Sequence, residues 1–209
     1  MIRSNIEFAT MGTSGKSIVV TSPEPGDGKS ITAVNLGIAM ARNGLRTILV
    51  DADLRRPTLH QTFQMPNHEG LSDQLCRTEP GEYIPIRDLE IEHLYLLTAG
   101  TIPPNPAELL GSARMGELLA SLKELADLVI LDTPPATIVA DPIILSGQAD
   151  GVVLVVSAGK SRREVSRQAV TNLRHSGANI LGVILNRAAQ ARGDRYTKYG
   201  SSTDEKTNP

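Results

Sequence analysis

The sequence predicts an α/β protein in which a mostly parallel central sheet is flanked by helices. Short apolar runs of strand length alternate with longer segments of helical pattern, and this alternation is typical of parallel strands joined by crossover helices. Two helix-stop pairs, Asn43-Gly44 and Ser176-Gly177, each stand a few residues before an apolar run. In such a sheet the carboxyl ends of the strands share one edge, where ligands collect.

The first strand is predicted at 18–21, a continuous apolar run, and the first helix at 29–43, which carries few charges before Arg42. Asn105 is expected to cap a helix that begins at Pro106, since proline suits the first helical position. The further strands are expected at 47–51, 94–98, 128–132, 151–156 and 180–185. The further helices are expected at 70–77, 106–125, 141–147 and 161–176. The apolar pattern stops near Ala188, so 1–187 is predicted to be one domain and 188–209 a flexible tail.

The composition excludes several classes of protein. A length of 209 residues allows one sizeable core. A net charge of −2 and an isoelectric point near 6.1 argue against nucleic acid as the main partner, and two Phe, four Tyr and no Trp argue against a stacking platform. The one cysteine excludes an internal disulfide and fits a reducing compartment. No apolar run approaches membrane-spanning length, so a membrane connection is expected to pass through a partner.

A phosphate-binding loop is predicted between the first strand and the first helix, at 22–30. Gly26 and Gly28 allow the backbone to fold around an anion, with the amino end of the helix beyond them. Lys29 brings a cation to the β- and γ-phosphates of a nucleotide, and Ser30 offers a hydroxyl to Mg²⁺. Pro23 replaces the first glycine of the usual loop pattern. The residues expected to bind the nucleotide here are Gly26, Asp27, Gly28, Lys29, Ser30 and Ile31.

Carboxylates follow two other predicted strands. Asp51 and Asp53 end the second strand, and strand alternation places them on the same side of the chain. One would order Mg²⁺ and its waters, while the other orients or deprotonates an attacking hydroxyl. The alternative is that both cap the following turn and pair with Arg55 or Arg56.

Asp132 ends the hydrophobic run 128–131, as the acidic residue of a Walker B strand does. Together with the loop it completes a predicted Mg·nucleotide site for phosphoryl transfer. Asn186, at the end of the last strand, is a candidate contact to the edge of a purine base, or alternatively part of an ordinary turn.

These motifs resemble the bacterial tyrosine kinases of capsule and exopolysaccharide synthesis, a branch of the P-loop NTPases with deviant Walker motifs. The resemblance covers roughly residues 2–187. Its most specific segments are Asp-Ala-Asp-Leu-Arg-Arg-Pro at 51–57 and Pro-Pro-Asn-Pro-Ala-Glu-Leu-Leu at 103–110, and it also includes Gly70-Leu-Ser-Asp73, Leu131-Asp-Thr-Pro-Pro135 and Asp141.

The resemblance implies a domain at 1–187 that phosphorylates tyrosine with ATP and Mg²⁺. Lys29, Asp51, Asp53 and Asp132 would be its catalytic residues, and Ser30, Asp53 and Asp132 would hold the metal. The acceptors implied are tail tyrosines phosphorylated between subunits, here Tyr196 and Tyr199. The implied partners are an activating transmembrane adaptor of polysaccharide synthesis, a tyrosine phosphatase and further copies of the chain, at the inner face of the plasma membrane. Of the family's ring-forming Glu-x-x-Arg-x-x-Arg motif only Arg3 remains, which leaves ring assembly open.

The alternative function is a switch ATPase of the MinD/ParA kind without a protein substrate. Those proteins carry a second lysine where this chain has Glu24, which disfavours that alternative. Arg162, Arg163 and Arg167 open the last predicted helix, either as a solvated face or as a docking surface for the adaptor or a neighbouring subunit.

Overall fold

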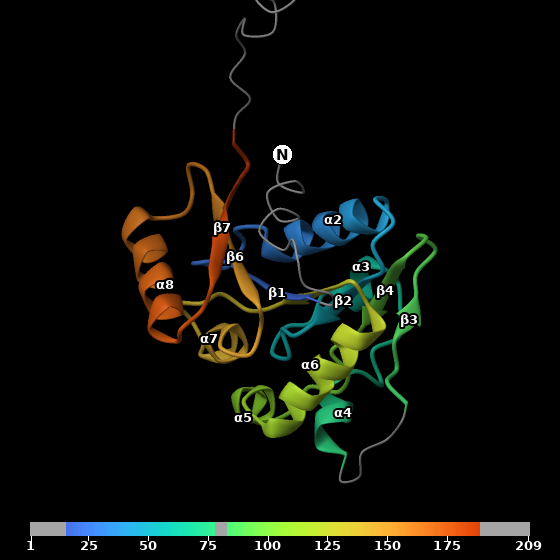
Figure 1. Ribbon diagram of the computed structural model, residues 1–209. Helices are drawn as coiled ribbons and strands as arrows, with labels where there is room; N and C mark the ends of the chain where they lie inside the picture. Colours follow the sequence, from blue (N-terminus) through green and yellow to red (C-terminus); the bar gives the residue numbers. More distant parts are fainter. Residues whose placement is uncertain (1–15, 78–82, 189–209) are drawn as a thin grey trace, which may run out of the picture.

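The computed structural model describes residues 16–77 and 83–188. The expectations for Arg3, Tyr196, Tyr199 and the tail beyond residue 188 lie outside these residues. Within them, seven strands form one sheet, which helices cover on both faces (Figure 1). The predicted α/β class is therefore confirmed.

The sheet has the order β3-β4-β2-β5-β1-β6-β7, and each neighbouring pair is parallel except β3 with β4. The six predicted strands are all present. The strands are β1 (Lys16–Thr21), β2 (Thr47–Asp51), β3 (Arg87–Asp88), β4 (Leu94–Leu97), β5 (Leu128–Asp132), β6 (Gly151–Ser157) and β7 (Ile180–Asn186).

The helices follow the predicted segments with two differences. The helices are α2 (Lys29–Ala41), α3 (Leu59–Thr62), α4 (Leu71–Cys76), α5 (Pro106–Leu110), α6 (Ala113–Leu125), α7 (Asp141–Ser146) and α8 (Arg163–His175). The short α3 was not predicted. The helix expected at 106–125 is divided at Gly111 and Ser112, because the Ser112 hydroxyl accepts the Met115 N–H and starts a new helix.

The expected cap of α5 was only half right. Pro106 does occupy the start of the helix, and Asn105 stands at the N-cap position. The Asn105 side chain, however, makes no capping bond to the backbone and instead donates to the Glu108 carboxylate at 2.6 Å.

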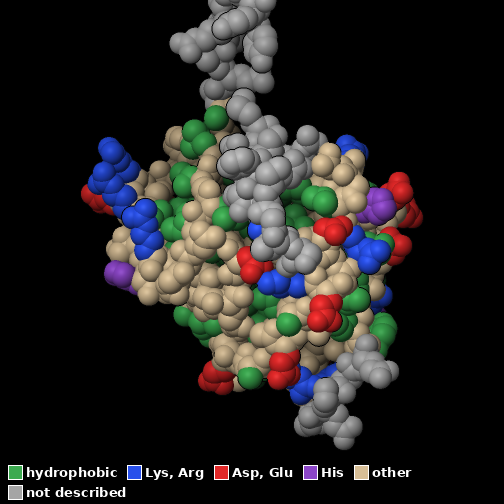
Figure 2. Space-filling view, in the orientation of Figure 1, with side chains coloured by type: hydrophobic (Ala, Val, Ile, Leu, Met, Phe, Trp, Pro, Cys, Tyr) green, Lys and Arg blue, Asp and Glu red, His purple; other side chains and the backbone are tan. Residues whose placement is uncertain are grey.

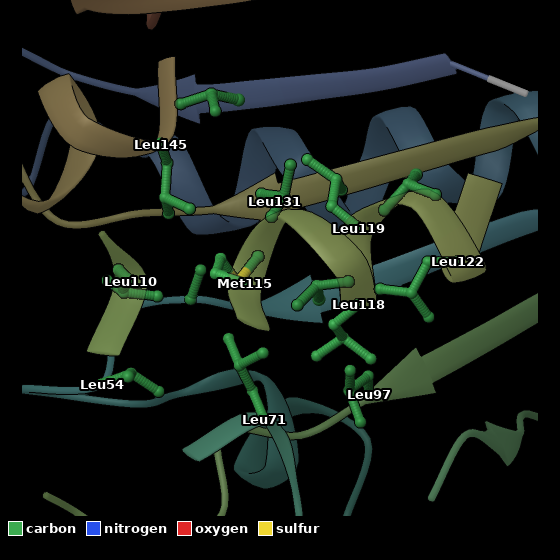
Figure 3. Packing of buried hydrophobic residues seen from close by; sticks show 14 of the residues in the cluster. Leu54, Leu71, Leu97, Leu110, Met115, Leu118, Leu119, Leu122, Leu131 and Leu145 are labelled. Atoms are coloured by element: carbon green, nitrogen blue, oxygen red, sulfur yellow. The ribbon is translucent and has the colours of Figure 1, made fainter. Parts of the chain in front are cut away.

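Two hydrophobic layers hold the sheet between the helices. Alternate residues of the central strands point to opposite faces, so Ile18 and Val20 pack under α2 while Val19 faces the other layer. That second layer gathers leucines from α4, α6 and α7, including Leu71, Leu118 and Leu145 (Figure 3). The inner strands are buried on both faces, and they hold the carboxyl ends of β1, β2 and β5 at one edge.

Candidate functional site

The predicted phosphate loop joins β1 to α2 at this edge. Gly26 and Gly28 adopt left-handed conformations, with φ of 78° and 95°, which a side chain would strain. Gly28 is also the N-cap residue of α2, so the amino end of a 13-residue helix opens at the loop. The loop therefore has the backbone shape that an anion-binding turn before a helix requires.

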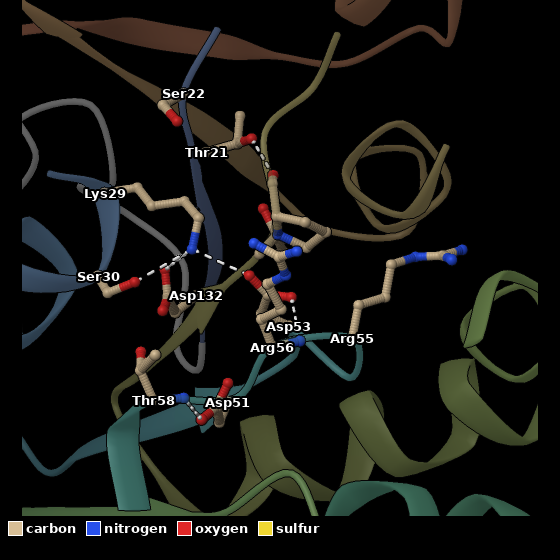
Figure 4. Close-up of polar contacts among 12 residues, drawn as sticks. Thr21, Ser22, Lys29, Ser30, Asp51, Asp53, Arg55, Arg56, Thr58 and Asp132 are labelled. Carbon is tan, nitrogen blue, oxygen red and sulfur yellow. Dashed lines mark hydrogen bonds and ion pairs between the residues drawn. The ribbon is translucent and has the colours of Figure 1, made fainter. Parts of the chain in front are cut away.

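Lys29 meets two of the three predicted carboxylates (Figure 4). Its ammonium lies 3.1 Å from Asp53 Oδ2 and 3.6 Å from Asp132 Oδ1, and it also donates to the Ser30 hydroxyl at 3.1 Å. These four residues come from the loop, from the segment after β2 and from the end of β5. The structure thus brings together the residues that the sequence indicated for phosphate and metal binding.

Asp132 is a buried carboxylate with unused bonding capacity. Its side chain is fully buried, and among the described residues neither of its oxygens has a hydrogen-bond partner. Burial raises the pKa of Asp132 to about 6, although the Lys29 ammonium acts in the opposite direction. A buried carboxylate that accepts no hydrogen bond from the described residues, and whose ion-pair partner Lys29 lies 3.6 Å away, is suited to a hydrated cation and its waters.

Asp51 lies beside Asp132 on the neighbouring strand, because the two residues are paired in the register of β2 and β5. Its Oδ2 accepts the backbone N–H groups of Thr58 and Leu59 at 3.0 and 2.9 Å, at the start of α3, while its Oδ1 is unpartnered among the described residues. Burial, and after it the charge of Asp132, raises the pKa of Asp51 to about 7.

The turn-capping alternative for Asp51 and Asp53 is therefore partly realised. Asp51 caps α3 through one oxygen, and Asp53 Oδ1 accepts the Arg56 backbone N–H at 3.1 Å. The alternative's ion pair with Arg55 or Arg56 does not form among the described residues, and Arg55 instead makes two hydrogen bonds, of 2.8 and 3.0 Å, to the buried Asp141. Each aspartate thus has one oxygen engaged in structure, and the other faces the site or is left unpaired.

Asn186 reaches the phosphate loop itself. Its side-chain amide donates to the Asp27 backbone carbonyl at 2.9 Å, and its oxygen accepts the Arg187 N–H. The contact of Asn186 with a base edge stays a prediction. Of the other predicted loop residues, Asp27 is buried and Ile31 is 67% exposed.

The arginines at the start of α8 divide into two kinds. Arg162 pairs with Glu24 across the loop, with Nη2 at 2.7 Å from Oε1. Arg163 and Arg167 are exposed, and within the described part of the chain neither forms an ion pair. Basic side chains gather over α8 in the space-filling view (Figure 2).

No cluster of three or more His, Cys, Asp or Glu side chains that could enclose a metal occurs within residues 16–77 and 83–188. A Mg²⁺ ion at this site would accordingly depend on Ser30, single carboxylates, phosphate oxygens and water, as this ion commonly does. None of the helices in the same ranges has the length and apolarity needed to cross a bilayer.

Comparison with known proteins finds similarity to P-loop NTPases and, among them, to bacterial tyrosine-protein kinases. A model of the ParA family, described as NUBPL iron-transfer P-loop NTPase, matches residues 14–201. Tyrosine-protein kinase YwqD of Bacillus subtilis is 43% identical over 200 residues, covering 96% of this chain and 84% of that protein. The putative tyrosine-protein kinase CapB of Staphylococcus aureus is 34% identical, covering 95% and 86%. Among solved structures, the kinase domain of Escherichia coli tyrosine kinase ETK superposes with a TM-score of 0.82 at 30% identity, covering 93% of this chain and 78% of that one.

Proposed function

The chain belongs to the bacterial tyrosine kinases of capsule and exopolysaccharide synthesis, within the ParA-like P-loop NTPases, and on that premise we propose that it phosphorylates its own C-terminal tyrosines with Mg·ATP. The observation that carries the proposal is that Lys29, Asp53 and Asp132 meet beside the phosphate loop, in which Gly26 and Gly28 have left-handed conformations. The acceptors proposed are Tyr196 and Tyr199, reached between subunits.

The residues present fit a nucleotide and its metal. The backbone of Gly26, Asp27 and Gly28 would surround the phosphates, with Ile31 at the edge of the loop. Ser30 and Asp53 would hold Mg²⁺ directly or through water. The oxygens of Asp132, which accept no hydrogen bond from the described residues, would accept from its hydration shell. When bound, the ion neutralises charge on the phosphate chain.

The chain's own groups supply the remaining steps. Lys29 would stabilise charge on the transferring phosphoryl group, and its ammonium lies at the strand ends between the Asp53 and Asp132 carboxylates. Asp51 is proposed to orient or deprotonate the tyrosyl hydroxyl. A pKa of about 7 suits that task, and Oδ1 has no other partner among the described residues. Asn186 keeps a second amide hydrogen for the base.

The partners proposed follow from the family. An adaptor that spans the membrane would activate the kinase and hold it at the inner face of the plasma membrane. A tyrosine phosphatase would reverse the modification, and further copies of the chain would present their tails. A nucleic acid is not among the proposed partners, because the chain carries a net charge of −2.

The test is intact-mass and phosphotyrosine analysis of the full chain after incubation with Mg·ATP, with and without the cytoplasmic segment of a candidate adaptor. Phosphate on Tyr196 or Tyr199 is expected, and the Tyr196→Phe/Tyr199→Phe variant should lose it while still binding nucleotide. Label on Tyr83 or Tyr95 would show that the tail is not the acceptor. Hydrolysis of ATP without any labelled protein would favour the switch ATPase.

A further inference from the structure

Three consecutive residues between β6 and α8 contact the phosphate loop, and we call residues 160–162 the strap. The Lys160 ammonium donates to the Pro25 carbonyl at 3.1 Å, and the Ser161 hydroxyl donates to Asp27 Oδ1 at 2.8 Å. Arg162 donates to Glu24 through both its guanidinium and its backbone N–H. Each strap residue therefore meets a different part of the loop.

The three strap residues differ in the charge of the partners that they contact. Arg162 takes the Glu24 carboxylate, and its hydrogen bonds lower the pKa of that group. Ser161 takes the buried Asp27, which also accepts the Glu24 backbone N–H at 3.1 Å. Lys160 meets only a neutral carbonyl, and no carboxylate in the described part of the chain forms an ion pair with it. The ammonium is exposed, so its charge remains available to an anion.

The Lys160 ammonium lies against the phosphate loop. A Cβ atom on Gly26 would stand 2.6 Å from Lys160 Nζ, so the absence of a side chain at Gly26 is what lets the ammonium approach. Gly26 also needs its left-handed φ of 78° to form the loop. The lysine is thus packed against the backbone segment that would surround the phosphates.

We propose that Lys160 is a second phosphate-binding cation of the nucleotide site, delivered by the strap. Lys29 is held between Asp53 and Asp132, whereas Lys160 forms no ion pair within residues 16–77 and 83–188 and feels the Glu24 carboxylate only from beyond ion-pair distance. A flexible lysine side chain can exchange the Pro25 carbonyl for a phosphate oxygen, which makes a stronger, charge-assisted hydrogen bond. The ligand assumed rests on the proposed function, but the test below does not require phosphorylation.

The test separates the charge of Lys160 from its hydrogen bond to Pro25. The dissociation constant of the β,γ-imido analogue of ATP, with Mg²⁺, is measured by isothermal titration calorimetry on the full chain. Lys160→Gln keeps a donor for the carbonyl and removes the charge, and Lys160→Arg keeps both. Lys123→Gln is the matched control, since Lys123 pairs with Asp150 at the opposite edge of the sheet.

We expect Lys160→Gln to weaken binding about tenfold, with an unchanged melting midpoint for the ligand-free chain. Lys160→Arg should stay within about threefold of the parent chain, and Lys123→Gln should match it. The proposal is overturned if Lys160→Gln binds as the parent chain does, or if Gln and Arg lose affinity equally. An absence of tyrosine phosphorylation alongside the expected affinities would defeat the kinase proposal and leave that of Lys160 intact.

Discussion

Two groups of charged residues lie around the phosphate loop in opposite surroundings. On one side stand Asp51, Asp53 and Asp132, each less than 10% exposed, at the ends of inner strands. On the other side stand the exposed Lys160 and Arg162 and the half-buried Glu24. We name these the carboxylate side and the strap side.

The two sides respond oppositely to their surroundings. Burial raises the pKa values of Asp51 and Asp132, whereas the hydrogen bonds of Arg162 lower the pKa of Glu24. Charge that is costly to bury is therefore concentrated where phosphoryl transfer is expected, whereas Glu24 and Arg162 form an ion pair nearer the solvent, which holds the loop. Substitutions on the two sides should consequently differ in size.

The largest effect is expected for Lys29→Met, on the carboxylate side. Removal of the ammonium that meets Asp53 and Asp132 should lower tyrosine phosphorylation by about 10³-fold, because a preorganised cation at the transferring group is lost. The measurement is the initial rate of phosphotyrosine formation, with the circular dichroism spectrum as a control for folding. Retained labelling would refute the role assigned to Lys29.

Arg55→Ala should cost stability, because it leaves the buried Asp141 carboxylate without its partner. We expect a loss of about 2 kcal/mol in the free energy of unfolding, below the range for wholly buried pairs, since the Arg55 side chain is 41% exposed. Urea denaturation measures it. The double variant Arg55→Ala/Asp141→Asn should recover most of the loss, and an equal loss in both would contradict the explanation.

Asp51→Asn should make the nucleotide-free chain more stable at pH 8 than its parent. The folded pKa of Asp51, about 7, lies above the ordinary value of 3.8, so folding is penalised once the pH exceeds the ordinary value and fully so above 7. The variant's advantage, about 3 °C in melting midpoint, should shrink as the pH falls to 5. A constant advantage across that range would show that the ionisation of Asp51 is not its source.

The smallest effect is expected on the strap side. Glu24→Gln and Arg162→Gln should each leave the melting midpoint of the ligand-free chain unchanged within error, because an ion pair whose arginine is 74% exposed adds little to stability. Differential scanning calorimetry at low and at moderate salt is the measurement. A clear, salt-independent loss would mean that the strap supports the folded loop more than an exposed ion pair can.

The parts predicted from sequence were those set by local pattern. The inner strands are continuous apolar runs, and Gly26, Gly28 and Lys29 form a local motif whose conformation follows from residue type. The strand β3 was missed because it is two polar residues paired at an edge, and α3 was missed because it is a single turn. The start of α3 is held by Asp51, which accepts the N–H groups of Thr58 and Leu59, seven and eight residues further along the chain.

The strap could not be predicted, because its contacts join residues 134 to 138 positions apart in the chain. Arg162 was noted in the sequence only as part of a basic helix start. No local pattern indicates that it faces Glu24 or that Lys160 lies against Gly26. The contact between Gly26 and Lys160 can be identified only once the strands β1 and β6 are known to be neighbours.

The register that places Asp51 beside Asp132 also links folding to ligand concentration. The Lys29 ammonium offsets the repulsion between these two strand ends only in part. A nucleotide that binds the folded chain alone should make the complex more stable than the free chain by RT ln(1 + [L]/Kd). At one hundred times Kd this amounts to about 2.7 kcal/mol. In a cell, the free energy of unfolding of the protein would then depend on the concentration of the nucleotide that it binds.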